Sequence, residues 1–314
     1  MIKFIYLYYF IHTFLILILN IVMVLISVAF LTLLERKILG YIQLRKGPNK
    51  ISYMGLFQPF SDAIKLFIKE SSLIFKSNMY MYMLSPMMLM ILMMMLWTII
   101  PIYSNLYSMN LTMIYLLCIM SLSVYSLMLA GWSSNSIYSL IGSLRSIAQT
   151  ISYEVSFIFI LMNSMILIEN FMIYDYYIYQ KYMMFLILLL PNSMMMIVSM
   201  LAELNRTPFD FAEGESELVS GFNVEYMSGK FAMIFISEYG SIMFMSYLFM
   251  LMFMKCEFMY LYFYLIYFLL VFLIIWIRGA YPRFRYDKLM SLTWKFYLPI
   301  SMYMIIMIIL MKMI

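Results

Sequence analysis

Long stretches without a charged side chain alternate with short polar segments along the whole chain. No charged residue occurs between Phe4 and Leu34, and none occurs between Ser77 and Leu144. A helix that crosses the hydrocarbon core of a bilayer needs about 20 apolar residues. Segments 101–110 and 131–136 interrupt the longer run with proline, glycine and polar side chains. The pattern predicts eight membrane-spanning helices, near residues 4–34, 79–100, 112–130, 138–168, 182–202, 228–253, 259–277 and 293–311.

The composition supports a polytopic membrane protein. Of the 314 residues, 66% are hydrophobic and 11% are charged, and the mean hydropathy is +0.95. A soluble domain carries about 25% charged residues, so this chain could not cover a soluble fold with polar surface. A soluble enzyme, a disordered chain and a disulfide scaffold are therefore excluded. We predict an all-α integral membrane protein with residues 1–314 as one domain, and we expect many of the 39 methionines to replace other aliphatic residues that face lipid.

The basic residues indicate which loops share one side of the membrane. Sixteen of the 20 Lys and Arg lie in or next to four inner loops, which are residues 35–76, 131–137, 203–227 and 278–292. The other four are on the opposite side. Such an excess of positive charge is typical of the inner face of a membrane protein. The count of eight spans places both termini on the outer side.

The first inner loop contains a predicted amphipathic helix at residues 57–70. Apolar and polar side chains separate at helical spacing, with Phe57, Phe60, Ile64 and Phe67 on one face and Asp62, Lys65 and Lys69 on the other. Such a helix lies in the interfacial plane of a membrane. Two interpretations remain open. The helix anchors the chain to lipid headgroups, or its aromatic face lines an opening for a lipid-soluble molecule.

Acidic residues concentrate in the third inner loop and inside two spans. The loop holds six of the fifteen acids, namely Glu203, Asp210, Glu213, Glu215, Glu217 and Glu225. Glu154 and Glu238 lie near the middle of the fourth and sixth spans. A charge at that depth costs about 2.5–3.5 kcal/mol and normally faces a protein interior. We predict a proton relay formed by Glu154, Glu203, Glu213, Glu225 and Glu238, whereas a solvated surface explains Glu215 and Glu217 equally well.

Few residues are available to hold a redox centre. The chain has one histidine, His12, and two cysteines, Cys118 and Cys256, which are too few for an iron–sulfur cluster, a zinc site or a bis-histidine haem. We predict no metal site and no redox centre. Three functional classes remain: an ion-coupled transporter, a redox-linked membrane subunit and a structural anchor. An anchor does not explain acids at mid-depth, and the residues alone do not decide between the other two.

Several inner segments resemble one protein family. Residues Ala202–Tyr226 are similar to the hallmark loop of the family of subunit 1 of respiratory complex I, the mitochondrial NADH:ubiquinone oxidoreductase. Glu35-Arg36-Lys37 and residues 45–70 resemble a second signature of that family. Arg278–Asp287 and Trp294–Pro299 resemble its C-terminal inner loop. The similarity runs in register along nearly the whole chain, while the outer loops do not match closely.

The resemblance implies an activity and a set of partners. It implies a core subunit of the mitochondrial inner membrane, with the inner loops in the matrix and both termini on the intermembrane-space side. The subunit belongs to an H⁺-translocating NADH:ubiquinone reductase without carrying a redox centre or a covalently bound or metal-ligated cofactor. Ubiquinone is the substrate, and FMN and the iron–sulfur clusters belong to partner chains. The implied partners are the hydrophilic quinone-site subunits, the iron–sulfur subunit with the terminal cluster, adjacent small membrane subunits and phospholipid, but no nucleic acid.

The resemblance also assigns roles to residues. It implies no catalytic residue in this chain. The residues expected to border a quinone tunnel are Arg36, Arg45, Phe57, Asp62, Arg206 and Asp210. The residues expected to carry the coupling signal are Glu154, Glu203, Glu213, Glu225 and Glu238. Further contributors from the loops are Glu35, Glu215, Glu217 and Arg278.

Overall fold

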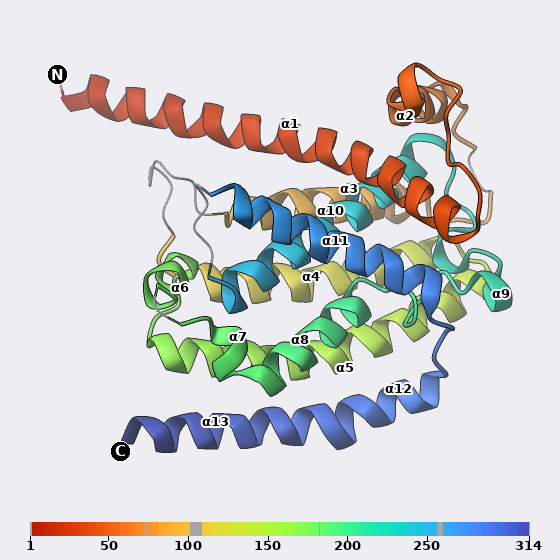
Figure 1. Ribbon diagram of the computed structural model, residues 1–314. Coiled ribbons are helices and arrows are strands. Elements are labelled where there is room, and N and C mark those ends of the chain that lie inside the picture. Colours follow the sequence, from red (N-terminus) through yellow and green to blue (C-terminus); the bar gives the residue numbers. More distant parts are fainter. Residues whose placement is uncertain (1, 73–74, 101–108, 182, 256–259, 314) are drawn as a thin grey trace.

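The computed structural model of the protein describes residues 2–72, 75–100, 109–181, 183–255 and 260–313. Within these ranges every regular element is a helix and there is no strand. The long helices lie side by side in one bundle (Figure 1). The predicted all-α membrane fold is therefore confirmed.

Seven helices in the described ranges are long and apolar enough to cross a membrane. Most of them agree closely with the predicted spans. The first differs, because it continues beyond residue 34 and carries Glu35 and Arg36 on a helix, where the sequence predicted a loop. The seven are α1 (Ile2–Ile42), α3 (Met79–Trp97), α4 (Thr112–Ser133), α5 (Ile137–Ile168), α10 (Ser228–Phe253), α11 (Leu261–Ala280) and a continuous last helix made of α12 (Tyr286–Leu292), the π-helical η3 (Thr293–Tyr297) and α13 (Leu298–Met313).

The predicted span near residues 182–202 consists of two shorter helices. These are α7 (Phe185–Leu188) and α8 (Leu190–Glu203), and they meet at Leu189 with φ −113° and ψ 42°. Pro191 explains the interruption, since proline has no N–H to donate and its ring collides with the carbonyl of the preceding turn. Residue 182 lies outside the described ranges. The fourteen residues of α8 are too few to cross a membrane alone, so the count of eight crossings stays a prediction.

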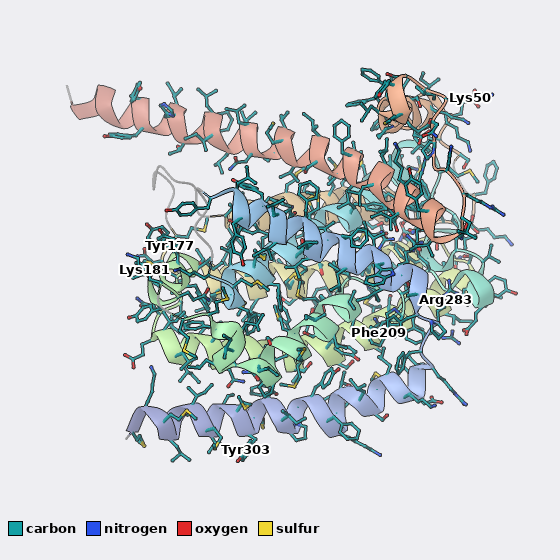
Figure 2. The ribbon with its side chains drawn as sticks, in the orientation of Figure 1. Lys50, Tyr177, Lys181, Phe209, Arg283 and Tyr303 are labelled. Carbon is teal, nitrogen blue, oxygen red and sulfur yellow. The ribbon has the colours of Figure 1, made fainter. Side chains whose placement is uncertain are left out.

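The short helices gather at the two ends of the bundle. At one end lie α2 (Gln58–Ile68) and α9 (Glu215–Leu218), with the 3₁₀ turns η1 (Tyr53–Gly55) and η2 (Gly221–Asn223) in the same loops. At the other end lie α6 (Ile173–Tyr179) and both termini (Figure 1). Figure 2 shows Lys50 and Arg283 at the first end and Lys181 at the second. The structure thus separates the basic inner loops from the two termini.

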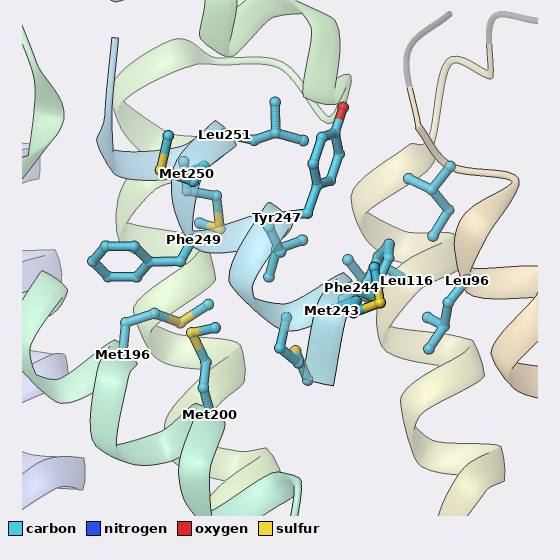
Figure 3. Packing of buried hydrophobic residues seen from close by; sticks show 14 of the residues in the cluster. Leu96, Leu116, Met196, Met200, Met243, Phe244, Tyr247, Phe249, Met250 and Leu251 are labelled. Atoms are coloured by element: carbon cyan, nitrogen blue, oxygen red, sulfur yellow. The ribbon is translucent and has the colours of Figure 1, made fainter. Parts of the chain in front are cut away.

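Helix α10 is the central helix of the bundle. It packs against α1, α2, α3 and α11, and most of its side chains are buried. Methionines fill much of this core, and Figure 3 shows Met196 and Met200 of α8 next to Phe249 of α10. Many methionines therefore pack inside the protein, and the expectation that they face lipid is wrong for these residues. A long unbranched thioether adapts to irregular gaps between helices, which explains their use in the core.

A substitution at Gly221 tests whether the conformation of the loop that contains η2 contributes to the stability of the fold. Its φ of +54° is unfavourable for a residue with a Cβ, and an added Cβ would collide with the carbonyl oxygen of Ala212. We expect Gly221→Ala to destabilise the fold by about 1–3 kcal/mol. Gly229→Ala is the matched control, because its Cβ would make only an ordinary contact of 3.7 Å with Phe67. Thermal denaturation of the detergent-solubilised protein measures both, and equal midpoints for the two variants would contradict the expectation.

Candidate functional site

The acidic inner loop between α8 and α10 is held in place by hydrogen bonds to three helices. Gln149 of α5 donates from Nε2 to the carbonyl oxygens of Ala202, at 2.7 Å, and Phe209, at 2.9 Å. At the far end of the loop, the hydroxyl of Tyr226 donates to the carbonyl oxygen of Ala130 on α4 at 3.2 Å. A buried carbonyl without a partner is costly. These bonds therefore fix a loop that has little regular structure of its own.

Aromatic contacts complete the attachment of the loop. The rings of Tyr226 and Tyr82 of α3 stack with their centroids 4.5 Å apart. Tyr82 also donates from its hydroxyl to the carbonyl oxygen of Glu225 at 2.6 Å. The amine of Lys230 lies 4.2 Å from the centroid of the Tyr82 ring, a favourable cation–π distance. The end of the loop, at the start of α10, is therefore packed against the ring of Tyr82.

Arg206 is the centre of a buried charge cluster. Its side chain is only 8% exposed, and Nη2 lies 3.6 Å from Oε2 of Glu238 on α10. Its guanidinium carbon lies 4.6 Å from the ring centroid of Tyr239. Burial alone would lower the pKa of Arg206, but Glu238, Tyr239 and the nearby acids Glu35 and Glu213 raise it above its ordinary value. Arg206 is therefore a permanent positive charge among carboxyl groups.

A second ion pair lies on the other side of Arg206. Glu35 of α1 is 5% exposed and forms an ion pair with Arg278 of α11. A small cavity of about 10 Å³ is bordered by Glu35, Arg206, Tyr239 and Arg278. The sequence prediction gave Glu35 and Arg278 only as contributors from the loops, whereas the structure places both of them beside the central arginine.

Asp210 connects the acidic loop to the C-terminal inner loop. Its carboxylate is 3.5 Å from Nη2 of Arg283, and its other oxygen accepts the backbone N–H of Glu213 at 3.1 Å. The backbone N–H of Phe284 donates to the carbonyl oxygen of Pro208 at 2.9 Å. Figure 2 shows Arg283 at the same end of the bundle as Phe209. Two inner loops that are far apart in sequence thus form one polar layer.

A cavity of about 90 Å³ lies between α3, α4, α10 and the acidic loop. Its polar wall contains Glu203, Arg206, Glu213 and Glu238, while apolar residues of α3 and α4 line much of the rest. Water occupies about 30 Å³ per molecule in the liquid. The cavity therefore has room for a few water molecules in contact with three carboxyl groups.

Glu154 and Glu203 extend the set of acids towards α5. Glu203 interacts electrostatically with Glu154, and one oxygen of each carboxyl group is buried without a hydrogen-bond partner in the described part of the chain. Glu203, Glu213 and Glu238 border the same cavity, and Glu154 interacts with Glu203. Four of the five predicted relay residues are brought together.

The fifth predicted relay residue, Glu225, and Glu217 of the same inner loop lie apart from this group. Glu225 lies beside Tyr82, and it does not border the acid-lined cavity. Glu217 is exposed and forms a 2.6 Å ion pair with Arg145 on α5, as expected of a solvated surface. The side chain of Glu215 lies outside the described part of the structure.

Arg36, Phe57 and Asp62 form a separate group at α2 and the inner end of α1, and Arg45 follows the end of α1. Nη1 of Arg36 lies 2.6 Å from Oδ2 of Asp62, which joins the inner end of α1 to α2. Phe57 and Arg45 are exposed. The structure therefore joins Arg36 to Asp62 and Arg206 to the acid cluster, but these two groups are distinct.

Several residues that shape the site are not among the predicted site residues. Tyr239 and Arg283 each contact a charged residue of the cluster, and Gln149 holds the loop. Two signals pointed to them. Arg283 lies inside the segment Arg278–Asp287 that carried the family resemblance, and a glutamine in an apolar span requires buried partners.

The described residues contain no group of three or more His, Cys, Asp or Glu that could hold a metal ion. Cys118 is exposed on the surface of α4, and Cys256 lies outside the described ranges. The prediction that redox groups belong to partner chains rests on the resemblance.

Comparisons with known proteins give a consistent result. A family model described as NADH dehydrogenase matches residues 15–309. The chain is 54% identical over 282 residues to NADH-ubiquinone oxidoreductase chain 1 of Aedes aegypti, with 90% of each chain covered. It is 52% identical to the protein of that name from Artemia franciscana, covering 90% of this chain and 94% of the relative. It is 46% identical to that of Didelphis virginiana, covering 91% and 92%.

Substitutions of Arg206, in the buried cluster, and of Arg36, in an exposed ion pair, should have different effects on stability. Arg206→Met would leave buried carboxyl groups without their cation, and we expect a loss of about 3–5 kcal/mol. Arg36→Met removes an exposed pair, whose side chains are 55% and 34% exposed, and we expect a loss of no more than about 1 kcal/mol. Thermal denaturation in detergent distinguishes these outcomes. A midpoint lowered more by Arg36→Met than by Arg206→Met would show that the buried cluster is not a structural centre.

Proposed function

Because this chain belongs to the NADH dehydrogenase family, with relatives called NADH-ubiquinone oxidoreductase chain 1, we propose that it is a core membrane subunit of respiratory complex I. In this role it forms the lipid-facing entrance and part of the wall of a ubiquinone tunnel. It also carries an acid chain that couples quinone reduction to proton translocation. The observation that carries the proposal is the group of half-buried carboxyl groups near the buried Arg206, three of which border one cavity.

The tunnel entrance is proposed at α2 and the inner end of α1. Helix α2 exposes an aromatic and aliphatic face that includes Phe57, Ile64 and Phe67. The ring of Phe60 contacts that of Phe30 on α1, with centroids 5.9 Å apart, while the Arg36–Asp62 ion pair joins the polar face of the same helix to α1. A helix with one apolar face and one charged face suits a molecule with a long apolar tail and a polar ring, such as ubiquinone.

The coupling step uses carboxyl groups instead of a redox group of this chain. A quinone that accepts electrons from a partner chain briefly carries negative charge, which attracts protons and repels carboxylates. Arg206 lies between Glu238 on one side and the Glu35–Arg278 pair on the other. A change of charge near the acidic loop therefore changes the electrostatic energy of both the Arg206–Glu238 pair and the Glu35–Arg278 pair. Protons then pass between Glu213, Glu238, Glu203 and Glu154 through the small cavity that three of them border.

The setting follows from the same proposal. The chain forms a single domain with eight crossings in the mitochondrial inner membrane, and both termini lie on the intermembrane-space side. The inner loops meet the hydrophilic quinone-site subunits and the iron–sulfur subunit with the terminal cluster, while small membrane subunits and phospholipid surround the helices. FMN and the iron–sulfur clusters are held by those partner chains. This subunit is thus part of an H⁺-translocating enzyme without holding its redox centres.

Glu238→Gln tests the coupling role. The variant keeps the size of the side chain but removes an exchangeable proton, so we expect the complex to assemble while protons moved per electron fall at least twofold. The measurement is the proton-to-electron ratio of reconstituted complex with NADH and a short-chain quinone. Glu217→Gln is the control, since Glu217 is exposed and remote from the cavity. A normal ratio in Glu238→Gln would remove Glu238 from the coupling chain.

A photoreactive quinone analogue tests the proposed tunnel entrance. We expect labelled peptides from residues 30–36 and 57–68, because the exposed aromatic face and the Arg36–Asp62 pair lie there. Mass spectrometry identifies the labelled peptides, and excess unlabelled quinone should abolish the labelling. Labels confined to the opposite end of the bundle, around α6, would contradict this location.

A further inference from the structure

Helix α5 presents one continuous face to the acidic loop. Gly142 lies below the loop, since a Cβ there would be 3.2 Å from both the carbonyl oxygen of Ala212 and the backbone nitrogen of Phe222. Gln149 follows two turns later and Tyr153 one turn after that, and the ring of Tyr153 lies 6.2 Å from that of Phe209. Residues at this spacing share one side of a helix. The loop is therefore shaped against α5.

Gln149 makes the only side-chain hydrogen bonds among the described residues that join the two ends of the segment 202–209. Its side chain is fully buried, and both protons of Nε2 are used, one on Ala202 and one on Phe209. Glu203 and Arg206 lie between these two carbonyl groups, and Asp210 follows directly. A single amide thus fixes the backbone on each side of the residues that carry the charges.

We propose that Gln149 is a positioning residue for the coupling site. By joining the carbonyl groups of Ala202 and Phe209, it holds Glu203 at the cavity and Arg206 against Glu238. This inference rests on the proposed function and extends it to a residue that contacts neither the quinone nor a carboxyl group of the relay. The charged side chains of this site need accurate placement, because a displacement of such a group by about 1 Å can reduce turnover about a hundredfold.

A merely structural glutamine occurs elsewhere in the same fold and supplies a matched control. Gln180 is also buried, and its Nε2 donates to two backbone carbonyl oxygens, those of Leu251 at 3.3 Å and Met252 at 2.6 Å. It lies next to α6, at the end of the bundle opposite the acidic loop. The two glutamines therefore have similar burial and bonding and differ in what they hold.

The experiment compares Gln149→Met and Gln149→Glu with the same two substitutions at Gln180, all in assembled complex. Methionine removes both donors without adding charge. Glutamate keeps the shape but donates only when protonated, and then through one proton. The titratable or charged groups around residue 149 include Arg145, Tyr153 and Glu154 on α5 and Glu203, Arg206 and Asp210 at the bonded segment. The uncharged methionine variant therefore separates geometry from added charge. The readouts are the amount of assembled complex, quinone-dependent turnover per assembled complex between pH 6 and pH 8.5, and protons moved per electron.

We expect Gln149→Met to lower turnover per assembled complex about tenfold or more and to lower the proton-to-electron ratio. Gln149→Glu should lose more activity at high pH than at low pH, where the protonated carboxyl group can donate. The Gln180 variants should keep the wild-type pH profile and ratio in whatever complex assembles.

Three results would overturn the proposal. The first is normal turnover and a normal proton-to-electron ratio in Gln149→Met, and the second is the same pH profile in all four variants. The third is failure of both Gln149 variants to assemble while the Gln180 variants assemble, since that result would assign Gln149 to folding alone. Glu238→Gln measured in parallel separates this outcome from the proposed function. If Glu238→Gln loses proton movement while the Gln149 variants are normal, only the positioning role fails. If all are normal, the proposed function itself fails.

Discussion

The cost of burying charge in a membrane protein organises this structure. Arg206 is surrounded by protein, and a guanidinium in that setting is tolerable only with acids close by. The structure supplies Glu238 from α10 on one side and the Glu35–Arg278 pair from α1 and α11 on the other. Three long helices are therefore arranged around one side chain that belongs to none of them. The loop that carries Arg206 must be placed accurately for any of these pairs to form.

Hydrogen bonds from helix side chains, and not regular structure, provide that placement. The acidic loop contains only the short elements α9 and η2 between α8 and α10, so its backbone groups need partners from elsewhere. Gln149 of α5 and Tyr82 of α3 provide them, and Tyr226 of the loop in turn donates to the carbonyl oxygen of Ala130 on α4. The same bonds place the carboxyl groups of Glu203 and Glu213 beside the cavity of about 90 Å³. Backbone support and titratable groups are thus combined within a few residues.

The sequence was sufficient to predict the class of fold and most helix bounds, because runs of apolar residues and the distribution of Lys and Arg are direct consequences of the bilayer. The bounds near 138–168 and 228–253 agree with α5 and α10 within a residue. It also predicted the acids at mid-depth, since a charge inside an apolar run has few explanations. It did not predict which of them meet. Glu35 was predicted to lie in a loop because the uncharged apolar run ends at residue 34, although the helix continues to Ile42. Contacts such as Asp210 with Arg283 join segments more than 70 positions apart, and nothing in local periodicity encodes that distance.

Helix α1 has a mechanical consequence. It is one rod of 41 residues, or about 60 Å at 1.5 Å per residue. Most of the described side chains between residues 8 and 20 are exposed, while the inner end holds Glu35 and Arg36 in succession. These neighbours point to different partners, Glu35 to α11 and Arg36 to α2. A tilt or rotation of the rod must therefore act on both contacts at once. A change in membrane thickness, or a neighbouring helix that presses on the outer end of α1, would therefore move both of the sites proposed for quinone entry and proton transfer.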